Sequence, residues 1–405
     1  MIIVDTSLSI LNSQFSIQEM TKKKILLLTD WYEPGFKAGG PIQSCRNFVA
    51  AMHEEFEISV LTSDRDLGES KPYEGIQTNQ WIQRPPGVSV YYADTRKLNT
   101  STLSALIRER QPDFIYLNSM YSYRFSVIPL LFNWRNKISA QVVMAPRGML
   151  QEGALQFKPI KKKMFINLLN LMGVPQKLRF HATDDQEKKD ILKHFPKAKS
   201  VEEIPNFSAP LPMHLKIIEK NPGSLRAVYI SRIIPKKNII FFLQVLGKVP
   251  TDIELHFDIY GEVEDEPYWE DAKQVISGLP SNISVEYHGP LPHEKVNETL
   301  ESSHIFVLPS KGENFGHAIF ESWSAARPCL ISDKTPWHHL KKQLTGWDLP
   351  LENEQAWLNA LDEAGDWDQV AFESWCRNSR EFAARHVGQY NLTRQYQNLF
   401  SSDRM

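Results

Sequence analysis

The sequence predicts an α/β protein with two doubly wound domains that face each other across a cleft. Its 405 residues are too many for one ordinary hydrophobic core, since a domain takes roughly 100–200 residues. Short apolar runs alternate with longer amphipathic ones, which is the pattern of βαβ units in parallel sheets. A stretch rich in proline, over 204–223, interrupts this rhythm once before the pattern resumes.

The first domain is expected over 22–206, and residues 1–21 are expected to be a flexible leader. That leader lacks the basic start and continuous apolar centre of a signal peptide. The strands of the domain are predicted from near-continuous apolar runs, which indicate a sheet buried on both faces. These runs span 25–29, 58–62, 114–118, 141–145 and 178–183.

A linker is expected over 207–224 and a second domain over 225–385. We expect residues 386–405 to form a C-terminal helix that crosses back to the first domain. Ligands of open α/β sheets bind outside the carboxyl ends of the strands, so two facing sheets place the site in the cleft. The strands of the second domain are predicted over 227–231, 255–260, 283–287, 305–308 and 329–332.

Composition excludes several other classes of protein. A formal charge of −2 does not suggest a nucleic-acid binder. The three cysteines are far apart and odd in number, which disfavours a disulfide framework and fits a reducing compartment. No apolar run approaches the roughly 18 residues of a transmembrane helix. We therefore expect a cytoplasmic protein.

The most informative segment spans 309–321, where an apolar strand ends, a polar loop with glycines follows, and a helix is predicted over 317–326. Exposed amides at such a helix start favour an anion such as a diphosphate. Glu321 stands about one turn into the helix, where a carboxylate can accept hydrogen bonds from ribose hydroxyls. Glu313 stands in the loop, nearer the sugar. Taken alone, this pair is better explained by helix capping and a solvated surface.

Two further segments follow apolar strands. The segment 231–238 carries Arg232 and Lys237, whose guanidinium and ammonium would neutralise the charge that grows on a leaving diphosphate. A solvated basic loop is the plain alternative. After the first strand, Gly39 and Gly40 allow close approach of the backbone and open the next helix, although most glycine pairs are simply turns.

In this order and on these strand ends, the three segments resemble the family-4 retaining glycosyltransferases, whose GT-B fold has two Rossmann-like domains. The resemblance covers about residues 24–396 and includes the signature that runs from Glu313 to Glu321. A similarity to a branch common in surface-polysaccharide biosynthesis rests on the segments 145–150, 314–317 and 335–337.

The resemblance implies a role for each matching residue. Arg232 and Lys237 would bind the donor diphosphate and form the catalytic group together with Glu313, which would hold the donor sugar. Asn118 and Arg147 would lie on the acceptor side. The other donor-binding residues would be Gly39, Gly40, Asn314, Phe315, Gly316, His317 and Glu321, the last on the ribose.

Three positions depart from the family pattern. Asn118 stands where many members have a histidine, which puts a general base there in doubt. Asn238 replaces a glycine after Lys237, and Arg327 replaces a small residue before Pro328. None of these changes removes a diphosphate ligand.

The expected reaction moves a sugar from a nucleotide-sugar to a glycan or lipid-linked glycan, without cofactor or metal. Retaining glycosidases use two carboxylates about 5–5.5 Å apart, and no convincing second carboxylate is found here. The resemblance instead implies front-face attack, in which the leaving phosphate accepts the acceptor proton. Asp64-Arg65-Asp66 has the form of an Asp-x-Asp metal motif, but the two-domain organisation disfavours that reading. Isolated histidines such as His288 are better explained as packing or surface groups than as metal ligands.

Other functions stay open. A sugar-nucleotide epimerase on the same fold would turn over the donor without an acceptor, whereas a phosphorylase should show a pyridoxal lysine site, which we cannot identify. A catalytically inactive partner subunit would bind nucleotide or glycan only, although the intact Arg232, Lys237, Glu313 and Glu321 argue against it.

Residues 158–172 begin with lysines and continue with large apolar residues at helical spacing, namely Phe165, Leu168, Leu169 and Met172. Such a helix can lie in a membrane interface, with lysines toward anionic lipid and apolar groups toward the acyl chains. Contact with the inner face of the cytoplasmic membrane would suit a lipid-linked acceptor. An ordinary core helix with a solvated basic start explains the pattern at least as well.

Overall fold

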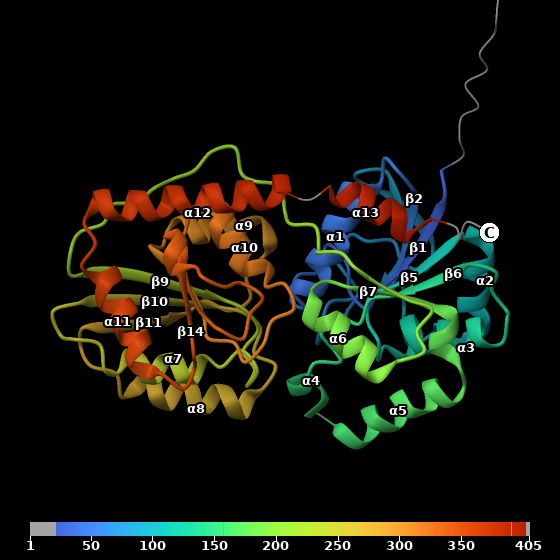
Figure 1. Ribbon diagram of the computed structural model, residues 1–405, viewed down its shortest axis with the longest axis horizontal. Coiled ribbons are helices and arrows are strands. Elements are labelled where there is room, and N and C mark those ends of the chain that lie inside the picture. The colour runs from blue at the N-terminus through green and yellow to red at the C-terminus, as the bar shows by residue number, and fades with distance from the viewer. Residues whose placement is uncertain (1–21, 157, 390, 402–405) are drawn as a thin grey trace, which may run out of the picture.

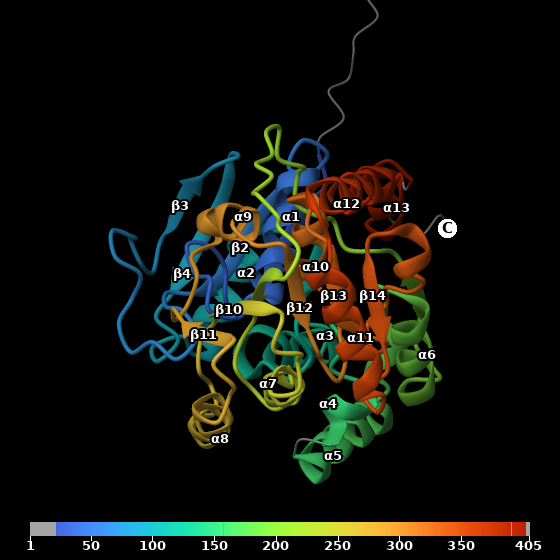
Figure 2. The same cartoon turned by 90° about the vertical axis from the view of Figure 1, so that its left-hand side faces the viewer.

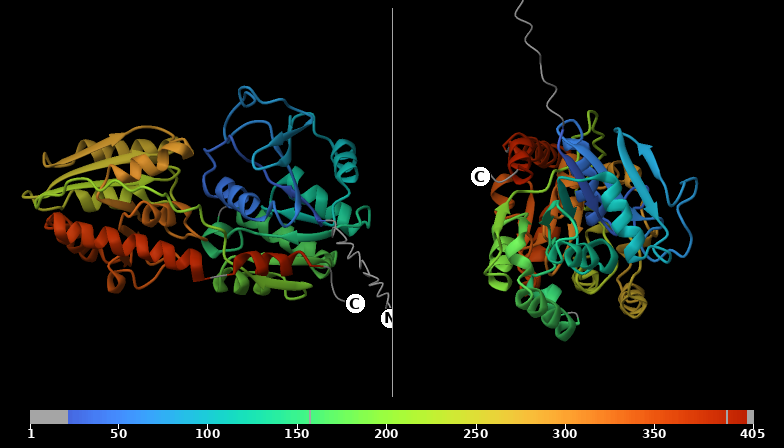
Figure 3. Two further views of the ribbon diagram at one scale, coloured as in Figure 1. Left: turned by 90° about the horizontal axis from the view of Figure 1, so that it is seen from above. Right: turned by 90° about the vertical axis from the view of Figure 1, so that its right-hand side faces the viewer.

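The computed structural model describes residues 22–156, 158–389 and 391–401, and they form two α/β units side by side (Figures 1 and 3). The leader predicted over 1–21 lies outside these residues. The first unit has an eight-stranded sheet in the order β3-β4-β2-β1-β5-β6-β7-β8, and the second has a six-stranded sheet in the order β11-β10-β9-β12-β13-β14. The predicted α/β class and the two doubly wound sheets are therefore present.

The sheet of the first unit is parallel except for β3, which pairs with β4 in the antiparallel direction. Its helices are α1 (Gly40–Met52), α2 (Thr100–Arg110), α3 (Ile128–Trp134), α4 (Glu152–Gln156), α5 (Pro159–Leu171) and α6 (Asp185–His194). Its strands are β1 (Lys24–Leu28), β2 (Glu57–Ser63), β3 (Trp81–Arg84), β4 (Val88–Ala93), β5 (Phe114–Leu117), β6 (Gln141–Met144), β7 (Leu178–Ala182) and β8 (Ser200–Glu203).

Strand β1 shows why these runs are continuously apolar. Its side chains alternate between the two faces of the sheet, and helices cover both faces. Ile25 and Leu27 therefore pack in the core beneath α1, whereas Leu26 and Leu28 pack in the core on the opposite face. The same burial on both faces explains why the central strands could be predicted from sequence.

The second unit is parallel throughout, and its helices cover both faces of the sheet (Figure 2). Its strands are β9 (Ser224–Ile230), β10 (Glu254–Tyr260), β11 (Ile283–Tyr287), β12 (Ile305–Leu308), β13 (Cys329–Ser332) and β14 (Gly346–Leu349). Its helices are α7 (Ile239–Leu246), α8 (Glu266–Ser277), α9 (His293–Glu301), α10 (His317–Ser324), α11 (Glu354–Gly365) and α12 (Gln369–Gln389).

All ten predicted strands are present, and the sequence analysis missed β3, β4, β8 and β14. Strands β3, β8 and β14 lie at sheet edges, where exposure shortens the apolar run. Strand β4 is different, because all six of its residues are buried and its run Val-Ser-Val-Tyr-Tyr-Ala carries a strand signal.

The C-terminal residues join the two units. Helix α12 lies along the second unit, and α13 (Leu392–Leu399) lies on the first (Figure 1). Tyr396 and Phe400 are buried there, and the rings of both lie within 6 Å of the Phe48 ring. The chain thus changes unit between α12 and α13, a few residues beyond the boundary expected at 385.

Helix α5 requires a correction. Leu169 is buried, and Phe165 and Met172 pack against the core of the first unit. These three residues are spaced by four and three positions, so they share the core-facing side of the helix. Of the four apolar residues expected to face lipid, only Leu168 points outward, with 51% of it exposed. The rest of that expectation is wrong.

Arg327 is fully buried beneath the end of α10. Its guanidinium donates to five backbone carbonyls, those of Lys216, Glu301, Ser303, Ala325 and Ala326. Burial lowers the pKa of Arg327. A small residue at this position, as the family pattern has it, would leave these carbonyls to other donors. Arg327 therefore fastens the linker, α9 and α10 to one another.

Replacing Arg327 by Met should destabilise the second unit strongly. Each buried carbonyl left without a donor costs about 1–3 kcal/mol, so we expect a loss of at least about 3 kcal/mol and a fall in Tm of about 6–12 °C. Arg377→Met, at an exposed position of α12, is the matched control. Thermal unfolding followed by circular dichroism measures both variants, and equal Tm values would contradict the role given to Arg327.

Candidate active site

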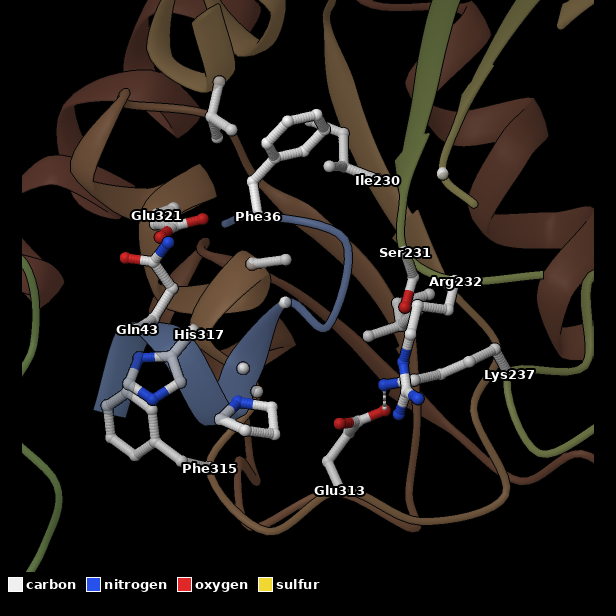
Figure 4. Close-up of a pocket in the computed structure, with 18 of the residues that line it drawn as sticks. Phe36, Gln43, Ile230, Ser231, Arg232, Lys237, Glu313, Phe315, His317 and Glu321 are labelled. Carbon is white, nitrogen blue, oxygen red and sulfur yellow. Dashed lines mark hydrogen bonds and ion pairs between the residues drawn. The ribbon is translucent and has the colours of Figure 1, made fainter. Parts of the chain in front are cut away.

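A cavity of about 260 Å³ lies between the two units at the carboxyl ends of their central strands. Every predicted site residue except Asn118 lines it. Arg232, Lys237 and Glu313 lie on one side of the cavity, and Gln43, Phe315, His317 and Glu321 lie on the other (Figure 4). The cleft of the predicted fold is thus where these motifs meet.

Two helices begin at this cavity without a side-chain cap. Helix α1 follows Gly39, at φ 64°, and α10 follows Gly316, at φ 76°. The left-handed φ of Gly316 favours glycine there, and a Cβ at this position would also come within 2.7 Å of Ile319 Cδ1. Helices α2, α6 and α8 are capped by the side chains of Asn99, Asp184 and Asp265, whereas α3, α5, α7 and α9 also lack a side-chain cap. The uncapped amides and the positive ends of both helix dipoles favour an anion in the cavity.

Asp66 holds the loop that precedes α1. Its Oδ2 accepts hydrogen bonds from the backbone amides of Phe36 at 2.7 Å and Lys37 at 3.1 Å. Asp64 forms an ion pair with Arg65 instead. The Asp-x-Asp segment thus makes intramolecular contacts that position the glycine loop.

The basic loop carries three cations, which have carboxylates beside them. Lys237 donates to Glu313 at 2.6 Å, and Arg232 donates to Glu264 at 2.9 Å. Burial alone would raise the pKa of Glu313, but Lys237 outweighs this effect and the pKa is lowered. Lys236 also lines the cavity, and burial lowers its pKa. Arg232 and Lys237 therefore stand in one cavity but pair with different carboxylates, which the sequence did not indicate.

Glu321 and Gln43 face each other across the other side of the cavity (Figure 4). In the part of the chain that the structure describes, Oε1 of each is buried without a hydrogen-bond partner. His293 Nδ1 lies 3.8 Å from Glu321 Oε1. Burial raises the pKa of Glu321 to about 7, opposed by Arg46. Two acceptors without donors suit a ligand that carries hydroxyl or amide hydrogens.

Among the described residues, three polar contacts join the two units around the cavity. Ser44 of α1 lies 2.9 Å from His317 Nε2, and Lys37 pairs with Glu262 at 3.0 Å. Burial and the nearby Arg147 lower the pKa of His317 to about 3, so its imidazole is neutral at pH 7. The third contact runs from Asn314 Nδ2 to the buried carboxylate of Glu187, at 3.1 Å.

Arg147 is a half-buried cation at the cavity wall. Its guanidinium donates to Asn118, Asn206 and the hydroxyl of Tyr116. Asn118 is 3% exposed and lies behind Arg147, so it does not line the cavity. Its side chain is too short to reach past the guanidinium that it holds. Arg147 itself presents a positive charge among neutral oxygens.

Several lining residues were missed by the sequence analysis. Gln43 and Ser44 stand in the first turn of α1, so the glycine pair before them was a usable signal. Lys37 and Glu262 are paired across 225 positions, and Glu187 reaches Asn314 across 127. No local pattern indicates such pairs, because the packing of the two units creates them.

Residues 214–365 match the model of the family described as glycosyl transferases group 1. A curated relative, the sulfoquinovosyl transferase SQD2 of Arabidopsis thaliana, is 24% identical over 120 residues. That match covers 30% of this chain and 22% of the relative, so the chain matches only a small part of that protein's length.

Solved structures match nearly the whole chain at low identity. Sucrose-phosphate synthase from Thermosynechococcus elongatus is 16% identical with a TM-score of 0.65, covering 94% of this chain and 98% of its own. Anabaena HepE, solved with UDP and glucose, is 13% identical with a TM-score of 0.67, covering 93% and 99%. S. aureus TarM, solved with UDP and α-GlcNAc-glycerol, is 14% identical with a TM-score of 0.64, covering 94% and 100%. The GT-B fold expected from the sequence is confirmed.

If Glu321 receives ribose hydroxyls, nucleotide binding should depend on pH. Donated hydroxyl hydrogens favour the carboxylate, so protonation of Glu321 competes with binding, and affinity should rise as pH increases through about 7. Between pH 6 and 8 the ionised fraction of such a group grows about tenfold, and the affinity for UDP should follow.

Calorimetric titration of UDP at pH 6, 7 and 8 measures this dependence. Glu321→Gln is the control, because it keeps the shape of the side chain and leaves only the titration of UDP itself. An identical pH dependence in the wild type and in this variant would remove Glu321 from the nucleotide site.

Proposed function

This chain carries a glycosyl transferases group 1 domain on a GT-B fold, and from that premise we propose that it moves a sugar from a nucleotide-sugar to a glycan or lipid-linked glycan. The transfer retains the anomeric configuration and uses no metal at the reacting atoms. The observation that carries this proposal is the cavity in which two uncapped helix starts face the Arg232–Lys237 loop.

The nucleotide would lie with its ribose against Glu321 and Gln43, whose buried oxygens lack donors among the described residues. Its diphosphate would lie between the start of α10 and the basic loop. UDP is the first nucleotide to test, because the structures of HepE and TarM were solved with UDP.

Donor binding would exchange the partners of Lys237. In the structure its ammonium is neutralised by Glu313. A diphosphate brings more negative charge than one carboxylate, so Lys237 would turn to the phosphate, and Glu313 would be free to accept a hydroxyl of the donor sugar. This exchange keeps the ammonium desolvated and aimed at the place where charge develops on the leaving group.

Charge on the leaving phosphate then assists the acceptor. As the bond to the anomeric carbon breaks, the phosphate oxygen gains basicity and can take the proton of the attacking hydroxyl on the same face of the sugar. Arg232, Lys237 and the amides at the start of α10 would stabilise the diphosphate. Contacts between the units, such as Ser44 with His317, would exclude water and limit donor hydrolysis.

Lys237→Ala and Arg232→Ala should each lower kcat by on the order of 100-fold or more while leaving the fold intact, because each removes a preorganised charge from the leaving diphosphate. Steady-state release of UDP from a panel of UDP-sugars, with glycan acceptors, measures the effect. Lys311→Ala is the matched control, since Lys311 is exposed beside the same loop and does not line the cavity.

Other outcomes would favour other functions. Near-wild-type turnover in both variants would contradict the diphosphate assignment. An isomerised UDP-sugar formed without acceptor would favour the epimerase, and binding of UDP without turnover across the panel would favour the inactive partner subunit. The anomeric configuration of the first product, read by NMR, decides retention.

We further propose that the acceptor is presented at a membrane, as in surface-polysaccharide assembly. No helix in the described ranges is long and apolar enough to cross a bilayer. Helix α5 nevertheless has an exposed apolar stripe, formed by Ile160, Met164, Leu168 and Leu171, which are 51–86% exposed. At about 100° per residue, the centre of this stripe lies about 110° around the helix from Phe165, Leu169 and Met172, so it lies beside the core-facing residues. Lys161 and Lys163, both exposed, flank it on either side, as in helices that lie in an anionic interface.

Vesicles that contain anionic lipid should therefore bind the protein at low salt and release it at high salt. Each well-placed lysine contributes about 1 kcal/mol at an anionic surface, so Lys161→Glu with Lys163→Glu should weaken binding at least tenfold, and Leu171→Ser should weaken it at any salt. Lys342→Glu with Val370→Ser, at exposed positions of the second unit, is the control. Absence of co-sedimentation at low salt would contradict the membrane contact and would favour a soluble acceptor.

A further inference from the structure

Strands β10 and β11 place imidazoles and carboxylates on one face of the second sheet, and none of these side chains lines the cavity of the candidate active site. Their parallel register sets His256 beside Ser284 and Asp258 beside Glu286. Because side chains alternate along a strand, these residues share a face with His288, which directly follows β11. The opposite face is apolar, and Phe257 packs there against Phe242 of α7.

The polar atoms of this group converge. Asp258 Oδ1 lies 3.1 Å from His256 Nε2 and 2.6 Å from His288 Nε2. One ligand atom each from His256, Asp258 and Glu286 lies within 4.8 Å of the other two. An ion with bonds of about 2.0–2.2 Å holds its ligand atoms up to about 4 Å apart. Small side-chain rotations would therefore bring the three ligand atoms within bonding distance of one ion.

The group is accessible to solvent, and the two paired strands beneath it hold its residues in position. The side chains of His256, His288 and Glu286 are 30%, 28% and 63% exposed, so an ion can enter from solvent. The two strands beneath are held in register over five residue pairs. Ser284 Oγ lies 2.7 Å from His256 Nδ1, which leaves Nε2 directed toward the carboxylates.

We propose that His256, Asp258 and Glu286 bind a divalent transition-metal ion, with zinc as the first candidate. Imidazole nitrogen together with carboxylate oxygen suits zinc and its neighbours, whereas calcium and magnesium take oxygen ligands. His288 is a positioning residue that holds the Asp258 carboxylate, as outer partners of metal ligands do.

The ion would cross-link β10 and β11. Strand β11 lies at the edge of the sheet, where an exposed strand frays and can pair with other chains. An ion bound between Asp258 and Glu286 ties β11 to β10. The ion would lie outside the cavity of the candidate active site. Its binding is therefore independent of the proposed sugar transfer, which uses no metal at the reacting atoms.

Zinc titration of the full chain, freed of metal by chelation and carrying no polyhistidine tag, tests the proposal. Calorimetry should give one site per chain, and cobalt in place of zinc should give the visible absorption of a low-symmetry nitrogen and oxygen site. Zinc at roughly 100 times its Kd should raise Tm by about 5–10 °C.

His256→Asn and Glu286→Gln are the variants, because they remove ligands and keep hydrogen-bonding side chains at a half-buried and at an exposed position. We expect at least a tenfold loss of zinc affinity in each, and the loss of the Tm increase in the double variant. His338→Asn, at another exposed histidine, should change neither. No stoichiometric uptake by the wild type, or equal uptake by the double variant, would overturn the proposal. Circular dichroism shows whether each variant is folded, and UDP binding tests the nucleotide site separately.

Discussion

Helices α1 and α10 both begin at the cavity between the two units, and neither supplies a side chain to its own first amides. Unpaired amides at a helix start need acceptors from water or from a ligand. The surrounding structure maintains this condition. Asp66 fixes the loop before α1, Gly316 provides the left-handed turn before α10, and the Ser44–His317 contact holds the two helix starts together. Many residues of the site therefore serve to position the uncapped N-termini of α1 and α10.

The cations around the cavity are held in position before any ligand arrives. Lys237, Arg232 and Lys37 each have a carboxylate partner. These ion pairs fix the positions of the three cations around the cavity and neutralise their charges. Arg147 differs, since its hydrogen bonds go to neutral oxygens. A ligand with two phosphates can compete with single carboxylates for these cations. The site therefore combines fixed positive charge with partners that an anionic ligand can replace.

The three departures from the family pattern have physical explanations in the fold. Asn238 adopts φ 59°, a left-handed conformation in which asparagine is the best substitute for glycine. Asn118 holds the guanidinium of Arg147, so its contribution is to positioning and not to proton transfer. Arg327 supplies five carbonyls with donors at the end of α10. Each change is thus accommodated without loss of a residue that faces the diphosphate position.

The sequence by itself determined the class of fold, the central strands and the loops that meet at the cavity. Strands buried on both faces are continuously apolar, and their carboxyl ends must share one edge of a parallel sheet, so Gly39, Arg232 and Glu313 could be placed together. Only the tertiary structure decided that Lys237 pairs with Glu313, that α5 exposes its Ile160–Leu171 stripe, and that His256 meets Asp258 and Glu286. The first set depends on local period and strand direction, which a short stretch of sequence contains. The second depends on strand register and on the packing of the units, which bring together residues that no local pattern connects.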